Sequence, residues 1–225
     1  MVLDVGEGVT SVKEGDEIYG QASVLAGGSG SFAEVAMGDA TMLALKPSRL
    51  SAVEAAALPL SGVSAWQALV EQINLSRGQT ILIHGGAGGI GSMAIQIAKH
   101  MGATVATTAS TRDVDFVKSL GADIVIDYKT QRFEELVRDA DAVFDTVGGE
   151  TLTRSFRALK KGGIIVSMVD QPDPELMKTY GVRAVRQGSR VTTECLGHLT
   201  ELVEQGVLTI LVDRIFPLEE SAAAI

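Results

Sequence analysis

Residues 86–91 constrain this chain more than any other stretch, because they combine a glycine pattern, G-x-G-x-x-G, with informative flanks. The run before them, residues 80–84, is apolar and rich in β-branched side chains, which is typical of a strand buried on both faces. After them, apolar residues recur at helical spacing from Ile90 to Met101. Glycines placed between a strand and a helix form the context that a dinucleotide-binding turn requires.

Each glycine of the pattern has an expected role in such a turn. Gly86 permits the tight turn, Gly88 lets the backbone approach a pyrophosphate, and Gly91 lets the helix pack closely on the strand. The free N–H groups at the helix start then hold the anion. The predicted phosphate-binding residues are Gly86, Ala87, Gly88, Gly89, Ile90 and Gly91. The alternative is a strand-to-helix turn without a ligand, and the flanks favour the cofactor cradle.

The composition narrows the class of protein. The chain has 225 residues, 46% of them hydrophobic, which is enough for a sizeable core. Its net charge of −9 argues against partners that are anionic, so we expect neither nucleic acid nor a membrane surface. No apolar run has membrane-spanning length, and the start lacks the order of a signal peptide. Cys195 is the only cysteine, so no intrachain disulfide forms and the cytoplasm is the expected compartment.

The residue pattern changes twice along the chain. Residues 1–48 have short strand-like and turn-like pieces, and the glycine-rich residues 27–31 precede an alternating run, which predicts a β-turn. An Ala-rich helical stretch follows and is broken at Pro59. Residues 80–209 alternate between strands and helices, which predicts a parallel, doubly wound Rossmann sheet with strand order 3-2-1-4-5-6. The predicted strands are 80–84, 104–108, 123–127, 142–145, 163–168 and 182–191, and the predicted helices are 89–101, 113–120, 131–139, 151–160 and 194–205.

The loop after the second strand of this unit bears on the choice of cofactor. No carboxylate occupies the strand end itself, whereas Ser110 and Arg112 offer a hydroxyl and a guanidinium, groups that suit a 2′-phosphate. This favours NADPH over NADH. Asp113 is close enough to serve NAD, but we interpret it as the carboxylate that opens the next helix. An exposed surface charge is the alternative role for Arg112.

Six motifs, separated along the chain, carry a resemblance to a known family. They are VGEGVTSVKEGDEIYG, GSFAEVAM, LPLSGVSAWQAL, ILIHGGAGGIGSMAIQIAK, FVKSLGADIVIDY and VFDTVGG. Together they resemble the zinc-independent quinone oxidoreductases, the zeta-crystallin-like branch of the medium-chain dehydrogenase/reductase superfamily. The resemblance implies an oxidoreductase that transfers a hydride from NADPH to a quinone or an α,β-unsaturated carbonyl. It also implies a homodimer or homotetramer. The implied domains are a partial GroES-like substrate lobe in residues 1–48, a Rossmann domain in 49–209, and a return to the lobe in 210–225.

The resemblance also assigns roles to single residues. It brings Gly88, Gly89 and Ile90 to the pyrophosphate. It brings Ser110 and Arg112 to the 2′-phosphate, although relatives also place the basic residue one position later, where Asp113 stands.

Four further residues follow from the resemblance. Tyr128 lies by the adenosine end, or else caps the core at a strand end. Thr146 and Val147 line the loop under the cofactor, with plain packing as the alternative for Val147. Ser64 takes the place where a threonine often touches the nicotinamide.

The sequence holds few signals of a metal site or of acid–base catalysis. The segment that holds a four-cysteine structural zinc lobe in zinc-dependent relatives is only a short turn here, and His84, His100 and His198 show no ligand spacing. We therefore expect no metal and interpret His84 and His100 as core or capping residues. No catalytic residue is predicted. A non-catalytic, NADPH-binding structural or regulatory protein is the alternative function.

Both ends depart from the family pattern. Relatives begin with a longer stretch before VGEGV and continue beyond FPLEE with a further helix and strand. We therefore expect the 225 residues to be a fragment of a longer reductase, or a truncated product, and to be inactive as they stand.

Overall fold

The computed structural model describes residues 1–223. The chain divides into two compact units, one made of Met1–Val63 with Arg190–Ile225 and the other of Ser64–Ser189. No helix within residues 1–223 has the length and apolar character that crossing a bilayer requires.

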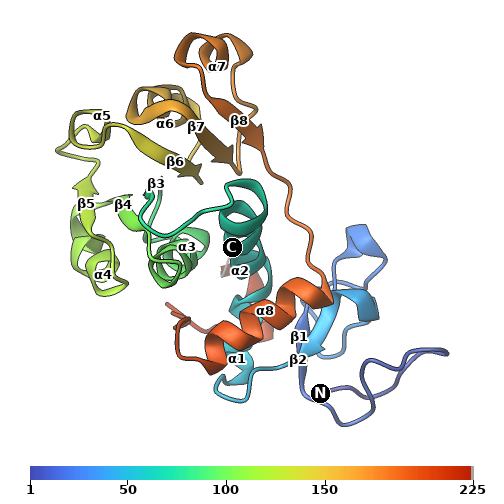
Figure 1. Ribbon diagram of the computed structural model, residues 1–225. Coiled ribbons are helices and arrows are strands. Elements are labelled where there is room, and N and C mark those ends of the chain that lie inside the picture. The colour runs from blue at the N-terminus through green and yellow to red at the C-terminus, as the bar shows by residue number, and fades with distance from the viewer. Residues whose placement is uncertain (224–225) are drawn as a thin grey trace. The chain divides into compact units, whose positions relative to one another are not determined.

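The unit formed by Ser64–Ser189 is built on a six-stranded parallel sheet (Figure 1). Its strands run in the order β5-β4-β3-β6-β7-β8, which is the predicted order 3-2-1-4-5-6. The doubly wound Rossmann sheet is therefore confirmed. The strands are β3 (Thr80–Ile83), β4 (Thr104–Ala109), β5 (Ile124–Asp127), β6 (Ala140–Asp145), β7 (Leu159–Ser167) and β8 (Arg183–Arg186).

Helices cover both faces of this sheet. Figure 1 shows α3 and α4 along one face and α5 and α6 along the other. The core between sheet and helices is apolar, with Leu82, Val143 and Ile165 fully buried on the central strands. The helical elements are η3 (Gln67–Gln72), α3 (Gly89–His100), η4 (Thr111–Asp113), α4 (Val114–Ser119), α5 (Phe133–Leu136), α6 (Gly149–Ser155), η5 (Phe156–Ala158) and α7 (Pro174–Tyr180).

Several elements of the sheet unit differ from the sequence-based expectation. The strand β8 ends at Arg186 and not at residue 191, and α5 covers only Phe133–Leu136 of the predicted 131–139. The helix α7 was not predicted, although it has clear end signals: Asp173 caps it by accepting a hydrogen bond from the Glu175 N–H, and Gly181 ends it with a left-handed φ of 63°. The strand β7 begins at Leu159 rather than at residue 163. The predicted helix over 151–160 therefore ends early, in the single turn η5.

The other unit holds little regular structure besides its helices. The strands β1 (Ile18–Gly20) and β2 (Leu43–Leu45) form an antiparallel pair. Its helical elements are η1 (Val24–Ala26), η2 (Ala40–Met42), α1 (Ala52–Ala57), α8 (Thr193–Glu204) and η6 (Leu218–Ala223), while α2 (Pro59–Trp66) begins in this unit and continues into the other. The helix break at Pro59 is confirmed, because α1 ends and α2 begins there. The alternating run after the glycine-rich turn forms exposed bends at residues 31–35, and within residues 1–223 no strand pairs with it.

The glycine turn packs more tightly than its sequence alone indicates. The left-handed backbone conformation belongs to Gly85, with φ 72°, and not to Gly86. Gly86 is required for space, because a Cβ there would overlap the Thr107 hydroxyl. A Cβ on Gly91 would overlap the Gly85 carbonyl, so the predicted close approach of α3 to the strand end is confirmed.

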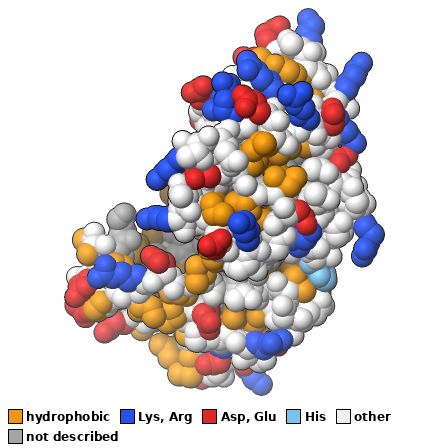
Figure 2. All heavy atoms as spheres, turned by 90° about the vertical axis from the view of Figure 1, so that its left-hand side faces the viewer, with side chains coloured by type: hydrophobic (Ala, Val, Ile, Leu, Met, Phe, Trp, Pro, Cys, Tyr) orange, Lys and Arg blue, Asp and Glu red, His pale blue; other side chains and the backbone are white. Residues whose placement is uncertain are grey.

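The edge of the sheet at β5 lies on the side of the molecule drawn in Figure 2. That view shows Lys, Arg, Asp and Glu side chains interspersed with hydrophobic ones. The exposed hydrophobic residues of β5 and its neighbours include Ile124, Tyr128 and Leu136.

We predict that Gly91→Ala destabilises the fold by about 1–3 kcal/mol, because the new methyl group meets a backbone carbonyl that cannot move freely. The matched control is Gly197→Ala, another glycine inside a helix, whose Cβ would meet nothing within 4 Å. This control is expected to stabilise by about 0.5–1 kcal/mol. Urea unfolding measures both. Equal effects of the two substitutions would contradict the close approach at Gly91.

Candidate cofactor site

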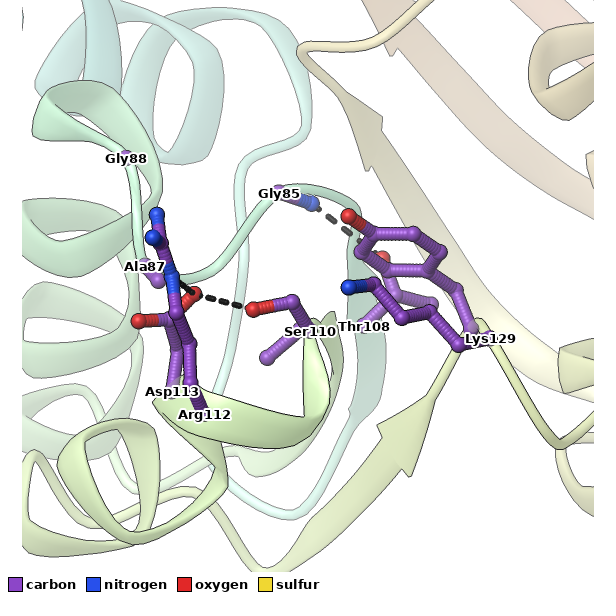
Figure 3. Close-up of a pocket in the computed structure, with 10 residues that line it drawn as sticks. Gly85, Ala87, Gly88, Thr108, Ser110, Arg112, Asp113 and Lys129 are labelled. Carbon is purple, nitrogen blue, oxygen red and sulfur yellow. Dashed lines mark hydrogen bonds and ion pairs between the residues drawn. The ribbon is translucent and has the colours of Figure 1, made fainter.

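A cavity of about 460 Å³ opens at the carboxyl ends of β3, β4 and β5 (Figure 3). The order of the sheet reverses at β3, which pairs with β4 on one side and β6 on the other. Parallel sheets bind ligands at such a reversal, in the crevice outside the strand ends. The volume is within the range of small-molecule sites. The lining residues are Gly85, Ala87, Gly88, Thr108, Ala109, Ser110, Arg112, Asp113, Tyr128 and Lys129.

The start of α3 forms one wall of the cavity. Gly88 is the N-cap and has no side chain to occupy the first N–H groups of the helix. The first backbone bond of the helix runs from the Ser92 N–H to the Gly88 carbonyl at 2.9 Å. The N–H groups of Gly89, Ile90 and Gly91 precede it, at the positive end of the helix dipole. This wall is suited to a phosphate.

The opposite part of the cavity carries charge. Figure 3 shows Lys129 extending toward Ser110 from one side, with Arg112 and Asp113 on the other. The Ser110 hydroxyl donates to the Asp113 carboxylate at 2.5 Å, and the Arg112 Nε lies 3.5 Å from the same oxygen. The Ser110 hydrogen bond lowers the pKa of Asp113, burial opposes this, and the charges of Arg112 and Lys129 lower it further. The cavity therefore holds two cations and one carboxylate at neutral pH.

The predicted position of Asp113 at the start of a helix is confirmed, but its side chain does not cap that helix. Asp113 occupies the N-cap position of α4, but its side chain makes no capping hydrogen bond. The turn η4 precedes α4 and gives Asp113 φ −102° and ψ 0°, outside the extended conformation that capping residues adopt. Its carboxylate instead turns to Ser110 and lines the cavity.

The structure brings five of the predicted site residues to the cavity: Ala87, Gly88, Ser110, Arg112 and Tyr128. Tyr128 is 58% exposed, so it does not cap the core. Arg112 has an 88% exposed side chain, and it still contacts Asp113 at the cavity wall.

The remaining predicted residues lie outside the cavity lining. Gly86 and Gly91 are buried behind the turn, and Gly89 and Ile90 follow it in α3. Ser64 is fully buried, with its hydroxyl 2.7 Å from that of Ser189.

The two predicted residues after β6 lie at the neighbouring strand end. Thr146 donates its hydroxyl to the His84 carbonyl at 2.8 Å. Val147 is 51% exposed, which does not support plain core packing.

Four cavity residues were missed, and Asp113 lines the cavity in addition to opening the helix. Lys129 follows Tyr128 directly, and a lysine just beyond the end of the third strand is the signal that could have found it. Thr108 and Ala109 end β4, where neighbouring parallel strands bring their carboxyl ends together. Gly85 stands directly before the G-x-G-x-x-G pattern, so the pattern does not include it.

Behind the turn lies a buried imidazole. His84 follows β3, is fully buried, and packs edge-on against Phe133 at 4.5 Å between ring centroids. Burial lowers its pKa to about 3, the Arg154 charge lowers it too, and the Glu134 carboxylate opposes them. The imidazole is therefore neutral at physiological pH. The expected core role of His84 agrees with this placement.

Glu134 and Arg154 form an ion pair beside this histidine, with 2.6 Å between Oε2 and Nη2. Burial raises the pKa of Glu134, but hydrogen bonds from Arg154, its own backbone N–H and Arg132 outweigh burial and bring the pKa to about 2. The Arg154 guanidinium also lies 4.9 Å from the centre of the Phe133 ring. Within residues 1–223, no three His, Cys, Asp or Glu side chains gather in a way that could hold a metal ion.

Known proteins share this architecture. A family model described as zinc-binding dehydrogenase matches residues 89–203. The chain is 44% identical over 181 residues to the 2-methylene-furan-3-one reductase of Solanum lycopersicum, covering 77% of this chain and 46% of that protein. It is 37% identical to the chloroplastic NADPH-dependent alkenal/one oxidoreductase of Arabidopsis thaliana, covering 100% of this chain and 57% of that protein.

A solved structure agrees with these relatives. The quinone oxidoreductase from Coxiella burnetii superposes with a TM-score of 0.88 at 35% identity, covering 99% of this chain and 71% of that one. The chain belongs to the zinc-binding dehydrogenase family, in the quinone oxidoreductase branch of the medium-chain dehydrogenase/reductase superfamily. The resemblance drawn from the sequence motifs is confirmed. The chain spans about half the length of the tomato and Arabidopsis relatives.

We predict that the neutral His84 makes the fold sensitive to acid. Its pKa is about 3 in the folded chain and near the ordinary 6.5 when unfolded, so the unfolded state binds more protons between these values. Stability is therefore lost as pH falls from about 6.5 toward 3, by at most about 1.4 kcal/mol per pH unit. Urea unfolding across this range, compared with His84→Phe, isolates the contribution. Parallel pH profiles for the two proteins would contradict a neutral, buried His84.

Proposed function

We propose that the protein is an NADPH-dependent oxidoreductase that transfers a hydride to a quinone or an α,β-unsaturated carbonyl. The observation that carries the proposal is the cavity at the β3–β4–β5 ends, which is lined by a helix start without a side-chain cap and by two cationic residues, Arg112 and Lys129. The family supports the reaction class. Relatives that are named as an alkenal/one oxidoreductase and a furanone reductase support carbonyl-conjugated alkenes as acceptors.

The donor set fits the proposed cofactor. The N–H groups of Gly89, Ile90 and Gly91 and the backbone of Gly88 suit a pyrophosphate. Arg112 and Lys129 suit a 2′-phosphate, because both side chains are cationic donors that line the cavity on either side of Ser110. Tyr128 supplies an aromatic face for the adenosine end. The one carboxylate, Asp113, opposes a phosphate and would instead accept from a ribose hydroxyl.

The other site residues stay proposals by resemblance. Gly86 and Ala87 shape the turn, Thr146 and Val147 lie under the cofactor, and Ser64 lies on the nicotinamide side. The hydroxyl of Thr146 holds the His84 carbonyl, which fixes the strand end next to the turn.

Hydride transfer asks little acid–base chemistry of this chain. When bound, NADPH supplies the hydride from its nicotinamide ring. The task of the residues described above is to bind the pyrophosphate and the adenosine end, and so to fix where the ring lies. Solvent can protonate the reduced acceptor, so we assign no catalytic residue.

Further features of the whole protein are proposed from the sequence and the family resemblance. We propose a zinc-independent protein, supported by the single cysteine, and a homodimer or homotetramer in the cytoplasm. We also propose the domain boundaries 1–48, 49–209 and 210–225. Neither nucleic acid nor a membrane is a proposed partner, in keeping with the net charge of −9.

We predict that NADPH binds more tightly than NADH, and that the cavity charges set the difference. Arg112→Ala and Lys129→Ala should each weaken NADPH binding by about 1–2 kcal/mol and leave NADH nearly unchanged, because each removes a charge-assisted contact. Asp113→Asn should strengthen NADPH binding, because it removes the opposing carboxylate. Lys118→Ala is the control, since Lys118 is equally cationic but lies on α4 and pairs with Asp115. Nicotinamide fluorescence titrations give the dissociation constant of each cofactor for the wild type and the four variants. Equal affinities for the two cofactors, with no effect of Arg112→Ala, would point to NAD.

The reaction is tested by NADPH oxidation with a panel of quinones and enones. Turnover of at least one acceptor supports the proposal. Tight NADPH binding without turnover across the panel would instead indicate the non-catalytic binding protein.

A further inference from the structure

The buried His84 joins three elements around the glycine turn. Its Nε2 lies 2.9 Å from the Ser155 hydroxyl at the end of α6, and its Nδ1 lies 3.2 Å from the Thr108 hydroxyl on β4. The same Thr108 oxygen accepts the Gly85 N–H at 3.2 Å. A continuous chain of hydrogen bonds therefore runs from α6 through the imidazole to the first residue of the turn.

The hydrogen atoms of this chain can be assigned by counting donors. The Ser155 hydroxyl lies 2.7 Å from the Thr151 carbonyl, which can only accept, so the one serine hydrogen is used there. Nε2 must then carry the imidazole hydrogen and donate to the Ser155 oxygen. This leaves Nδ1 as an acceptor, and the Thr108 hydroxyl donates to it. The lone pairs of the Thr108 oxygen are thereby directed to the Gly85 N–H.

We propose that His84, in its neutral Nε2–H tautomer, is a positioning residue for the dinucleotide turn: it orients the Thr108 hydroxyl that holds the Gly85 N–H. The inference rests on the proposed function only in naming NADPH as the ligand of that turn. His84 itself does not line the cavity, whereas Thr108 and Gly85 do.

The geometry makes this more than core packing. Gly85 has a left-handed φ of 72°, and a Cβ there would lie 2.7 Å from the Thr146 hydroxyl, so the turn is confined on its β6 side. Thr146 also binds the His84 carbonyl. On the β4 side the Thr108 hydroxyl is the partner of the Gly85 N–H, and its direction depends on which imidazole nitrogen is protonated. A phenyl ring at position 84 would fill the space without directing that hydroxyl.

The surroundings keep the imidazole in one protonation state. The charged groups near it are Arg154 and Glu134, which pair with one another beside Phe133. A neutral ring with one fixed hydrogen is the arrangement that satisfies both hydroxyl partners at once.

The first experiment reads the tautomer and the turn without any cofactor. In the ¹⁵N-labelled chain, NMR should show the His84 hydrogen on Nε2 at neutral pH. Amide exchange at Gly85 should accelerate about tenfold or more in His84→Phe and in Thr108→Val, because both disturb the acceptor of that N–H. A hydrogen on Nδ1, or unchanged Gly85 exchange in a folded His84→Phe, would overturn the inference.

The second experiment measures how the same substitutions change the affinity for NADPH. His84→Phe and Thr108→Val should each raise the NADPH Kd about tenfold, and the double variant should be little worse than either, since both break one chain. Thr108→Ser, which keeps the hydroxyl, should recover most of the affinity. Leu82→Ala destabilises the same strand away from the chain, and His100→Phe changes an exposed histidine of α3; both should bind NADPH as the wild type does.

The outcomes separate the two claims. If the wild-type chain fails to bind NADPH, the proposed function is wrong, and the tautomer and Gly85 exchange still decide the role of His84. If the wild type binds and a folded His84→Phe binds equally well, the positioning role is wrong. A loss of affinity in Leu82→Ala as large as that in His84→Phe would likewise overturn it, because destabilisation alone would then explain the effect.

Discussion

The site depends on one constraint: the turn after β3 must leave the first N–H groups of α3 open while its own polar groups are enclosed by the sheet. Three N–H groups of the turn have partners of this kind. The Gly85 N–H is held by the Thr108 hydroxyl, the Gly86 N–H by the Thr108 carbonyl at 3.0 Å, and the Gly88 N–H by the Gly85 carbonyl at 3.0 Å. The N–H groups that follow are then available to an anion.

The sheet order makes this arrangement possible. Because β3 lies between β4 and β6, the turn leaves the sheet where the neighbouring connections diverge to opposite faces. Thr108 and Thr146, at the ends of those two neighbours, reach the turn from both sides. The same divergence opens the cavity toward β5, where Tyr128 and Lys129 follow the strand end. Fold and candidate site are therefore consequences of one topology.

The sheet can be predicted from the sequence because each strand and helix is indicated by residues within its own short segment. Buried β-branched runs alternate with helical periodicity, and the strand order follows from the rules for parallel connections. The strand-order rules do not point to Lys129 and Thr108, because the two residues come to line one cavity only once β4 and β5 are paired. Asp113 stands at the helix start that its neighbours predict, but its carboxylate accepts from Ser110 rather than capping the helix, a contact that the sequence pattern did not indicate. The helix α7, by contrast, carries its cap and its final glycine in the sequence and could have been predicted.

The central claim is that a dinucleotide lies along the carboxyl edge of β3, β4 and β5. The most direct measurement is the amide shift map of the ¹⁵N-labelled chain on addition of NADPH. The account predicts the largest shifts at Gly88–Gly91, where the pyrophosphate is proposed to bind, and at Ser110–Arg112 and Lys129, where the adenosine end is proposed to bind. Shifts confined to other parts of the chain, with these amides unchanged at saturation, would contradict it.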